Sequence, residues 1–133
     1  MENDLRVAIG SAADIVTARQ KGRALAMELG FDGSDLTLIA TAISEVARNI
    51  VDHAKHGEII LSPAHNGMRH GIAILARDQG PGIPDVARAM QYGFSTRKGL
   101  GVGLPGAKWL MDDFDIDTKV GKGTTITMKK WLQ

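Results

Sequence analysis

The spacing of apolar side chains changes once within the first part of the chain, from the period of a strand to that of a helix. Residues 5–9 alternate between apolar and polar positions, which predicts a short strand. Two segments with the apolar spacing of a helix follow. The first runs from Asp14 to Gly30, and the second starts at Ser34 or Asp35. The helical apolar positions are Ile15, Ala18, Gly22, Leu25, Ala26 and Leu29, then Leu36, Ile39, Ala40, Ile43, Val46, Ala47, Ile50 and Ala54.

Alternating patterns return in the second half of the chain. Residues 58–64 and 69–76 flank the pair Asn66-Gly67, which is the strongest short-range signal for a tight hairpin between two strands. A helix is predicted over 104–111 and strands over 114–119 and 124–132. With about five strands, three main helices and two hairpins, this order favours an α/β sandwich in which a mixed, mostly antiparallel sheet carries its helices on one face.

An irregular segment separates these elements. From Gln79 to Gly103 neither period is present, apart from a short helix predicted around 84–90. Loops of this length inside a compact domain are uncommon and usually functional. We therefore expect residues from about Gly82 to Gly103 to form a lid over a ligand site.

Composition limits the classes of function. The 133 residues are 44% hydrophobic and 23% charged, which fits one globular domain spanning 1–133. A net charge of +1 without a basic block argues against nucleic-acid or membrane surfaces, and zero Cys excludes disulfides and thiolate metal sites. His53 and His56 are three apart, but no third ligand is spaced for zinc. An acidic N-terminus and no long apolar run predict a cytoplasmic protein.

Two polar residues on the second helix are candidates for chemistry. Glu45 and Asn49 are four positions apart, so their side chains are neighbours on one helix face. At about 100° per residue, Glu45 lies roughly opposite the apolar stripe. The pair is then either part of an ordinary solvated face or a site covered by a ligand.

Two glycine-rich segments add further candidates. Asp78-Gln-Gly80-Pro-Gly82 follows a strand; it is a β-turn or an acid beside backbone that approaches a ligand closely. Gly99, Gly101 and Gly103 precede the helix from 104, whose N-terminus favours phosphate. A dinucleotide fold would need a strand directly upstream, and the residues there are polar. No P-loop pattern occurs either.

The order of these motifs is more specific than any one of them. Along the chain stand Glu45-x-x-x-Asn49, Asp78-x-Gly80-x-Gly82, Gly99-x-Gly101-x-Gly103 and Gly121-x-Gly123-Thr-Thr125. This series resembles the four nucleotide-binding boxes of the GHKL (Bergerat-fold) ATPases, which include gyrase and histidine kinases. The resemblance covers nearly the whole chain. It is strongest to the small bacterial anti-sigma and switch serine/threonine kinases, through the runs at 42–49, 78–85 and 103–106.

The resemblance implies a role for each box. Asp78 would meet the adenine amino group of ATP with support from the Thr125 hydroxyl, while Gly80 and Gly82 would admit the base. Asn49 would coordinate Mg²⁺, and Glu45 would be the base that orients the attacking hydroxyl. Gly99, Gly101 and Gly103 would wrap the phosphates.

The resemblance also implies an activity. The chain length is used up by the nucleotide fold, so a phosphoryl acceptor must come from another protein, and the family acts on STAS-domain proteins. We expect a serine/threonine kinase whose further partner is an output enzyme such as a phosphatase. An anti-sigma factor or a nucleotide-gated binding module shares the same boxes, although a pure binder does not need the Glu45 carboxylate. Arg97 and Lys98 depart from the small residues common in the lid and would face the γ-phosphate or a partner.

Overall fold

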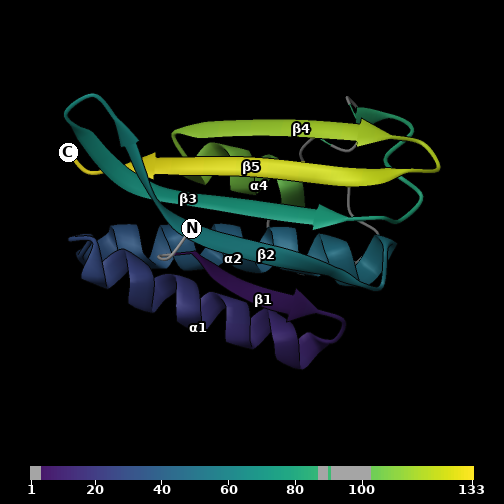
Figure 1. Cartoon of the computed structure of the whole chain (residues 1–133), viewed down its shortest axis with the longest axis horizontal. Coiled ribbons are helices and arrows are strands. Elements are labelled where there is room, and N and C mark those ends of the chain that lie inside the picture. Colours follow the sequence, from purple (N-terminus) through teal and green to yellow (C-terminus); the bar gives the residue numbers. More distant parts are fainter. Residues whose placement is uncertain (1–3, 87–89, 91–102) are drawn as a thin grey trace.

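The computed structural model describes residues 4–86, 90 and 103–133 of the chain. Within these ranges the elements form two layers, with helices behind one sheet (Figure 1). They are, in chain order, β1 (Leu5–Ile9), α1 (Ala12–Glu28), α2 (Gly33–His53), β2 (Gly57–Asn66), β3 (Arg69–Asp78), α4 (Gly103–Leu110), β4 (Asp113–Lys119) and β5 (Gly123–Trp131).

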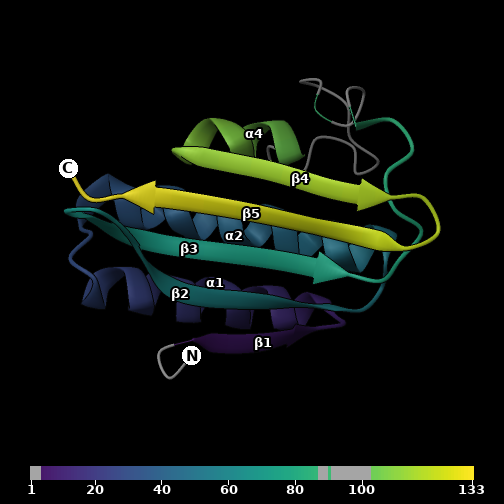
Figure 2. The same cartoon turned by 45° about the horizontal axis from the view of Figure 1, so that its top comes forward.

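The sheet has the strand order β1-β2-β3-β5-β4, and each of these neighbouring pairs is antiparallel. The described helices α1, α2 and α4 lie on the same side of it, and none of them covers the other face (Figure 2). The predicted fold class is thereby confirmed: an α/β sandwich with an antiparallel five-stranded sheet and helices on one face. None of the described helices is long and apolar enough to cross a membrane.

Helix α2 lies at the centre of the core, between α1 and α4. An added Cβ on Gly22 of α1 would lie only 2.1 Å from Cδ1 of Ile43, so this glycine lets the two helices approach closely. The strands supply every second residue to the same core. Side chains that are almost fully buried there include Ile39, Ile43, Val46, Ile50, Ile59, Leu61, Ile72, Ile74, Ile126 and Met128.

Both long helices begin slightly earlier than predicted. The residues before them, Ser11 and Asp32, have extended backbone with φ of −156° and −146°, which is typical of an N-cap position. Asp14, the predicted start of α1, lies instead in its first turn, where its Oδ2 accepts a hydrogen bond of 2.8 Å from the Gly10 amide. The aspartate thus supports the helix start from inside the first turn.

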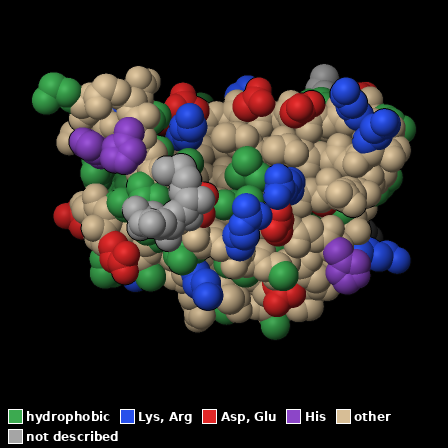
Figure 3. All heavy atoms as spheres, in the orientation of Figure 1, with side chains coloured by type: hydrophobic (Ala, Val, Ile, Leu, Met, Phe, Trp, Pro, Cys, Tyr) green, Lys and Arg blue, Asp and Glu red, His purple; other side chains and the backbone are tan. Residues whose placement is uncertain are grey.

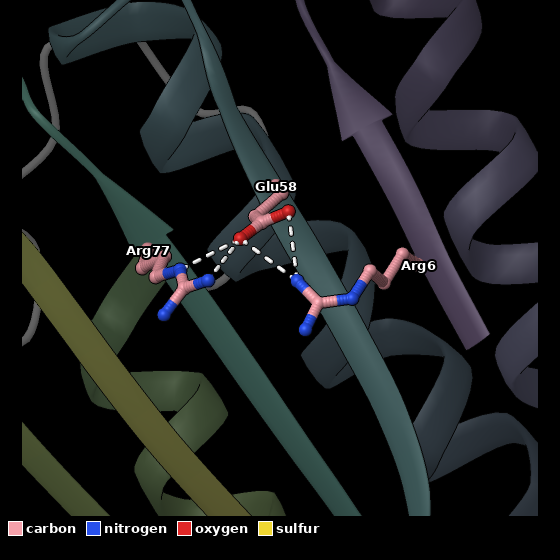
Figure 4. A network of polar contacts seen from close by, with 3 residues as sticks. All are labelled: Arg6, Glu58 and Arg77. Carbon is pink, nitrogen blue, oxygen red and sulfur yellow. Dashed lines mark hydrogen bonds and ion pairs between the residues drawn. The ribbon is translucent and has the colours of Figure 1, made fainter. Parts of the chain in front are cut away.

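The open face of the sheet carries a network of charges. Glu58 on β2 lies between Arg6 on β1 and Arg77 on β3 (Figure 4). Arg77 donates from Nε to Oε1 of Glu58 at 2.6 Å, and Nη1 of Arg6 lies 3.3 Å from the same oxygen. Two arginines share one carboxylate there, so this part of the open face has an excess of positive charge.

Strand β4 forms one edge of the sheet and alternates strictly. Phe114 and Ile116 pack against the core, whereas Asp113, Asp115 and Asp117 between them are exposed. Acidic side chains accordingly gather along the edge over β4 (Figure 3). This edge therefore presents a row of negative charge.

Candidate functional site

Glu45 is buried, contrary to the solvated face that the spacing within α2 allowed. Its exposed fraction is 4%, because α4 packs against α2 and its first residue contacts the carboxylate. The apolar stripe on the other side of α2 faces the sheet and α1, so the whole circumference of the helix at this point is covered. A carboxylate buried to this extent requires partners that stabilise its charge.

Each oxygen of the Glu45 carboxylate has such a partner. The backbone N–H of Gly103 donates to Oε1 at 3.0 Å, and Nη1 of Arg48 lies 3.6 Å from Oε2. Gly103 has a φ of +67°, a conformation that favours glycine. The start of α4 is therefore attached directly to the candidate base.

Asn49 follows Glu45 one helical turn later, about 6 Å along the axis. Its side chain is partly buried. An amide oxygen is a ligand type that Mg²⁺ accepts alongside water and phosphate oxygens. The donor chemistry at this position therefore fits a magnesium ion whose other ligands are water and phosphate oxygens.

Asp78 ends β3 beside the C-terminal end of α2. Its Oδ1 accepts a hydrogen bond of 2.9 Å from the Gly80 amide, and no hydrogen bond to Oδ2 is found in the described part of the chain. An added Cβ on Gly80 would lie 2.6 Å from the Cβ of Ala54, so Gly80 packs tightly onto the end of α2. The carboxylate is thus held by one oxygen while the other can accept from an amino group.

The glycines around Asp78 make close contacts within the protein itself. An added Cβ on Gly82 would lie 2.4 Å from the Lys119 carbonyl oxygen, and one on Gly123 would lie 2.1 Å from the Asp78 carbonyl oxygen. Both have positive φ, 78° and 127°. Close packing between the β4–β5 hairpin and the segment from Asp78 to Gly82 is therefore sufficient to explain why these positions are glycine.

The two threonines after Gly123 face opposite sides of the sheet. Thr124 pairs with Asp78 across the strands and is 5% exposed, whereas Thr125 pairs with Arg77 on the open face. The Thr124 hydroxyl lies 2.8 Å from that of Thr118. Glu45 and Asn49 lie on α2, which covers one face of the sheet. Thr124 is on that same face, and Thr125 is on the opposite, open face.

Thr118 connects this region to the segment that follows Asp78. Its hydroxyl oxygen accepts a hydrogen bond of 2.9 Å from the Ile83 amide and lies 3.1 Å from the carbonyl oxygen of Gly123. The sequence prediction named Thr125, and it named neither Thr118 nor Thr124. The period-two alternation of the last strand contained the signal for Thr124, because only one of two adjacent threonines points toward the helices.

Asp78 and Thr125 share one surface depression. Both line an open depression of about 640 Å³ at the end of the sheet, together with Glu58, Arg77 and His56. This depression includes side chains of the open face, whereas Glu45 and Asn49 are on the helix that covers the other face. The structure thus groups Glu45, Asn49 and Gly103 along α2, and Asp78, Gly80 and Thr124 at its end.

Several predicted residues fall outside the described part of the chain. Gly99 and Gly101 are among them, as are Arg97 and Lys98. Of the predicted lid over 82–103, the structure describes 82–86, 90 and 103, so most of that prediction and the short helix around 84–90 remain predictions. The Gly103 amide is the part of the glycine-rich loop that the described residues place at the site.

An antiparallel sheet backed by helices, with a Glu-Asn pair on the central helix and an aspartate-glycine turn at its end, is consistent with a GHKL ATPase fold. The family model described as "Histidine kinase-like ATPase domain" matches residues 10–130, and the chain belongs to this family. It is 49% identical to the serine/threonine-protein kinase RsbT of Bacillus subtilis, over 100% of both chains. It is 33% identical to the anti-sigma F factor of Caldanaerobacter subterraneus, over 86% of this chain and 83% of the relative. The anti-sigma F factor of Geobacillus stearothermophilus is 30% identical over 98% and 93%.

Proposed function

We propose that this chain is an ATP-dependent serine/threonine protein kinase that phosphorylates STAS-domain proteins. It would act as a partner-switching regulator in bacterial stress signalling, within the assembly called the stressosome. The 49% identity to a serine/threonine kinase over the full length of both chains supports the activity. The buried Glu45 carboxylate, one turn from Asn49 and bonded to the Gly103 amide, is the structural observation that carries the proposal.

The adenine end of the site would lie at the end of β3. Asp78 would accept from the adenine amino group through the carboxylate oxygen that the Gly80 amide does not occupy. Gly80 and Gly82 would allow the base to approach the backbone. A threonine hydroxyl would support the contact, and Thr124 is favoured over Thr125 because it pairs with Asp78 and faces the helices.

The phosphate end of the site would lie closer to the N-terminus of α2. ATP supplies the phosphoryl group, and Asn49 would hold the Mg²⁺ that neutralises its charge. The backbone amides of Gly99 and Gly101 would contact the phosphates, and that of Gly103 would join them by leaving the Glu45 carboxylate. Glu45 would accept a hydrogen bond from the acceptor hydroxyl and take its proton, so this chain provides positioning and a base.

A second function is favoured by a specific observation. Anti-sigma F factors are 30–33% identical to the chain over most of its length, so a regulator that binds a sigma subunit has the same framework. In either case the partners are proteins. A kinase released from its STAS-domain partner would then act on an output enzyme such as a phosphatase. We expect the protein to work in the cytoplasm.

Transfer of labelled phosphate from ATP to a STAS-domain protein tests the proposal. The purified chain should label a serine or threonine of that protein only when Mg²⁺ is present, and binding should be measured on the same samples. Tight binding of the STAS protein without any labelling would move the assignment to the binding-module function. Binding of a sigma subunit without labelling would support the anti-sigma function instead.

A further inference from the structure

The β2–β3 hairpin places two histidines opposite each other near its tip. His65 on β2 pairs in register with His70 on β3. The two residues between the strands are Gly67 and Met68, and Gly67 has a φ of 63°, as a tight hairpin turn with glycine in its first central position requires. The predicted hairpin is therefore confirmed, although Asn66 is the last residue of β2 and not part of the turn itself.

The two imidazole rings meet through the same kind of nitrogen. Their Nδ1 atoms are 2.9 Å apart, and the rings are nearly perpendicular, with centroids at 4.9 Å and an interplanar angle of 88°. Both side chains are exposed. Histidine side chains gather at this end of the molecule (Figure 3). The two Nδ1 atoms therefore face each other at a position that solvent can reach.

The backbone beneath this pair is fixed on both sides. The ladder between β2 and β3 continues to Asn66 and Arg69, beyond the histidines. The carbonyl oxygen of His70 accepts a hydrogen bond of 2.8 Å from Leu132, and the guanidinium of Arg69 lies 4.4 Å from the centre of the Trp131 ring. The backbone positions from which the two rings project are thus set by the sheet.

This spacing matches the geometry of a metal chelate. Imidazole nitrogens lie about 2.0–2.1 Å from metals such as zinc, so two of them at a right angle are about 2.9 Å apart, and at a tetrahedral angle about 3.4 Å apart. A right angle is the arrangement of neighbouring ligands in square-planar or octahedral complexes, which Cu²⁺ and Ni²⁺ form with imidazole. The observed distance agrees with the right angle.

We propose that His65 and His70 form a two-histidine site for a divalent transition metal that prefers ligands at right angles, Cu²⁺ or Ni²⁺. Among the residues described, no group of three His, Asp or Glu side chains is placed to hold a metal, so water would fill the remaining positions. In the metal-free pair one Nδ1 donates its hydrogen to the other. Binding requires that ring to carry its hydrogen on Nε2, and both rings to turn slightly so that their Nδ1 lone pairs point at the ion.

Titration with NiCl₂ followed by calorimetry tests the site directly. The wild-type chain should bind one Ni²⁺, and His65→Ala and His70→Ala should each abolish this binding. The double variant of His53→Ala with His56→Ala is the matched control, because it removes the other two histidines and should leave binding unchanged. Absence of binding by the wild-type chain, or retention of it by His65→Ala and His70→Ala, would overturn the proposal.

Two further measurements make the result independent of folding and of the proposed kinase function. Circular dichroism and ATP binding of the variants should equal those of the wild-type chain, since both histidines are exposed at the hairpin tip. Nitrogen NMR of the wild-type imidazoles should show that Ni²⁺ acts on the Nδ1 atoms of these two rings. Signals of His53 or His56 responding in their place would contradict the assignment.

Discussion

Gly103, at the start of α4, donates its backbone N–H to the carboxylate of Glu45 on α2 at 3.0 Å, across 58 positions of sequence. The residue that ends the predicted lid is thereby bonded to the residue proposed as the base. Arg48 holds the other carboxylate oxygen from the next turn of the same helix. Any movement of the first turn of α4 must therefore change what surrounds this carboxylate.

Glu45→Gln should separate nucleotide binding from phosphoryl transfer. The glutamine oxygen still accepts from the Gly103 amide, and Arg48, whose side chain is 32% exposed, can turn away from the new NH₂ group into solvent, so the fold and the affinity for ATP should be retained. The amide cannot take a proton, so turnover on a STAS-domain protein should fall by about 10²–10⁴-fold, the usual effect of losing a general base. Transfer and calorimetric binding measured on the same samples check this.

Two comparisons control that experiment. Glu28→Gln changes an exposed glutamate at the end of α1 in the same way and should leave turnover unchanged. Asn49→Ala should weaken the binding of Mg-ATP itself. Normal turnover in Glu45→Gln would exclude Glu45 as the base.

Asp78→Asn should weaken ATP binding by about 1–3 kcal/mol, the range for a hydrogen bond that involves a charged group. The asparagine oxygen can still accept from Gly80, but its NH₂ group then faces the adenine amino group, and two donors meet. Isothermal calorimetry measures the change. Asp117→Asn, on the exposed edge strand, is the control and should have no effect; unchanged affinity in Asp78→Asn would remove Asp78 from the adenine site.

A pair of valine substitutions should decide between the two adjacent threonines. Thr124→Val removes the hydroxyl that faces the helices beside Asp78, and ATP affinity should fall by about 0.5–1.5 kcal/mol, as expected for one neutral hydrogen bond. Thr125→Val, on the open face, should leave the affinity unchanged. The reverse ranking in nucleotide titrations would restore Thr125 as the adenine contact.

Gly123→Ala should destabilise the fold far more than Gly121→Ala. Both glycines have positive φ, 127° and 82°, so both alanines incur backbone strain. Only at Gly123 does the new Cβ collide, 2.1 Å from the Asp78 carbonyl oxygen, whereas nothing lies within 4 Å of it at Gly121. Overpacking of this kind typically lowers the free energy of unfolding by about 1–3 kcal/mol. Urea denaturation that finds equal losses would show that the close approach relaxes freely.

Helical periodicity was sufficient to predict the core face of α2 but not the environment of the candidate site. The apolar stripe of α2 and the adjacency of Glu45 and Asn49 follow from spacing within one helix, and the structure agrees with both. The burial of Glu45 depends on Gly103, a contact between distant segments that local spacing does not contain. Likewise, the need for glycine at position 123 arises from the neighbouring strand, which only the folded sheet brings close.

The row of aspartates on β4 has a consequence for the protein at high concentration. An edge strand offers unpaired backbone groups to any other strand, including the same edge of a second molecule. In an antiparallel pairing of two such edges, Asp113, Asp115 and Asp117 of one chain would stand beside those of the other, and like charges on paired strands repel. Strand β4 is thereby protected against forming continuous sheets between molecules, and replacing these aspartates by threonine should promote fibrous aggregation.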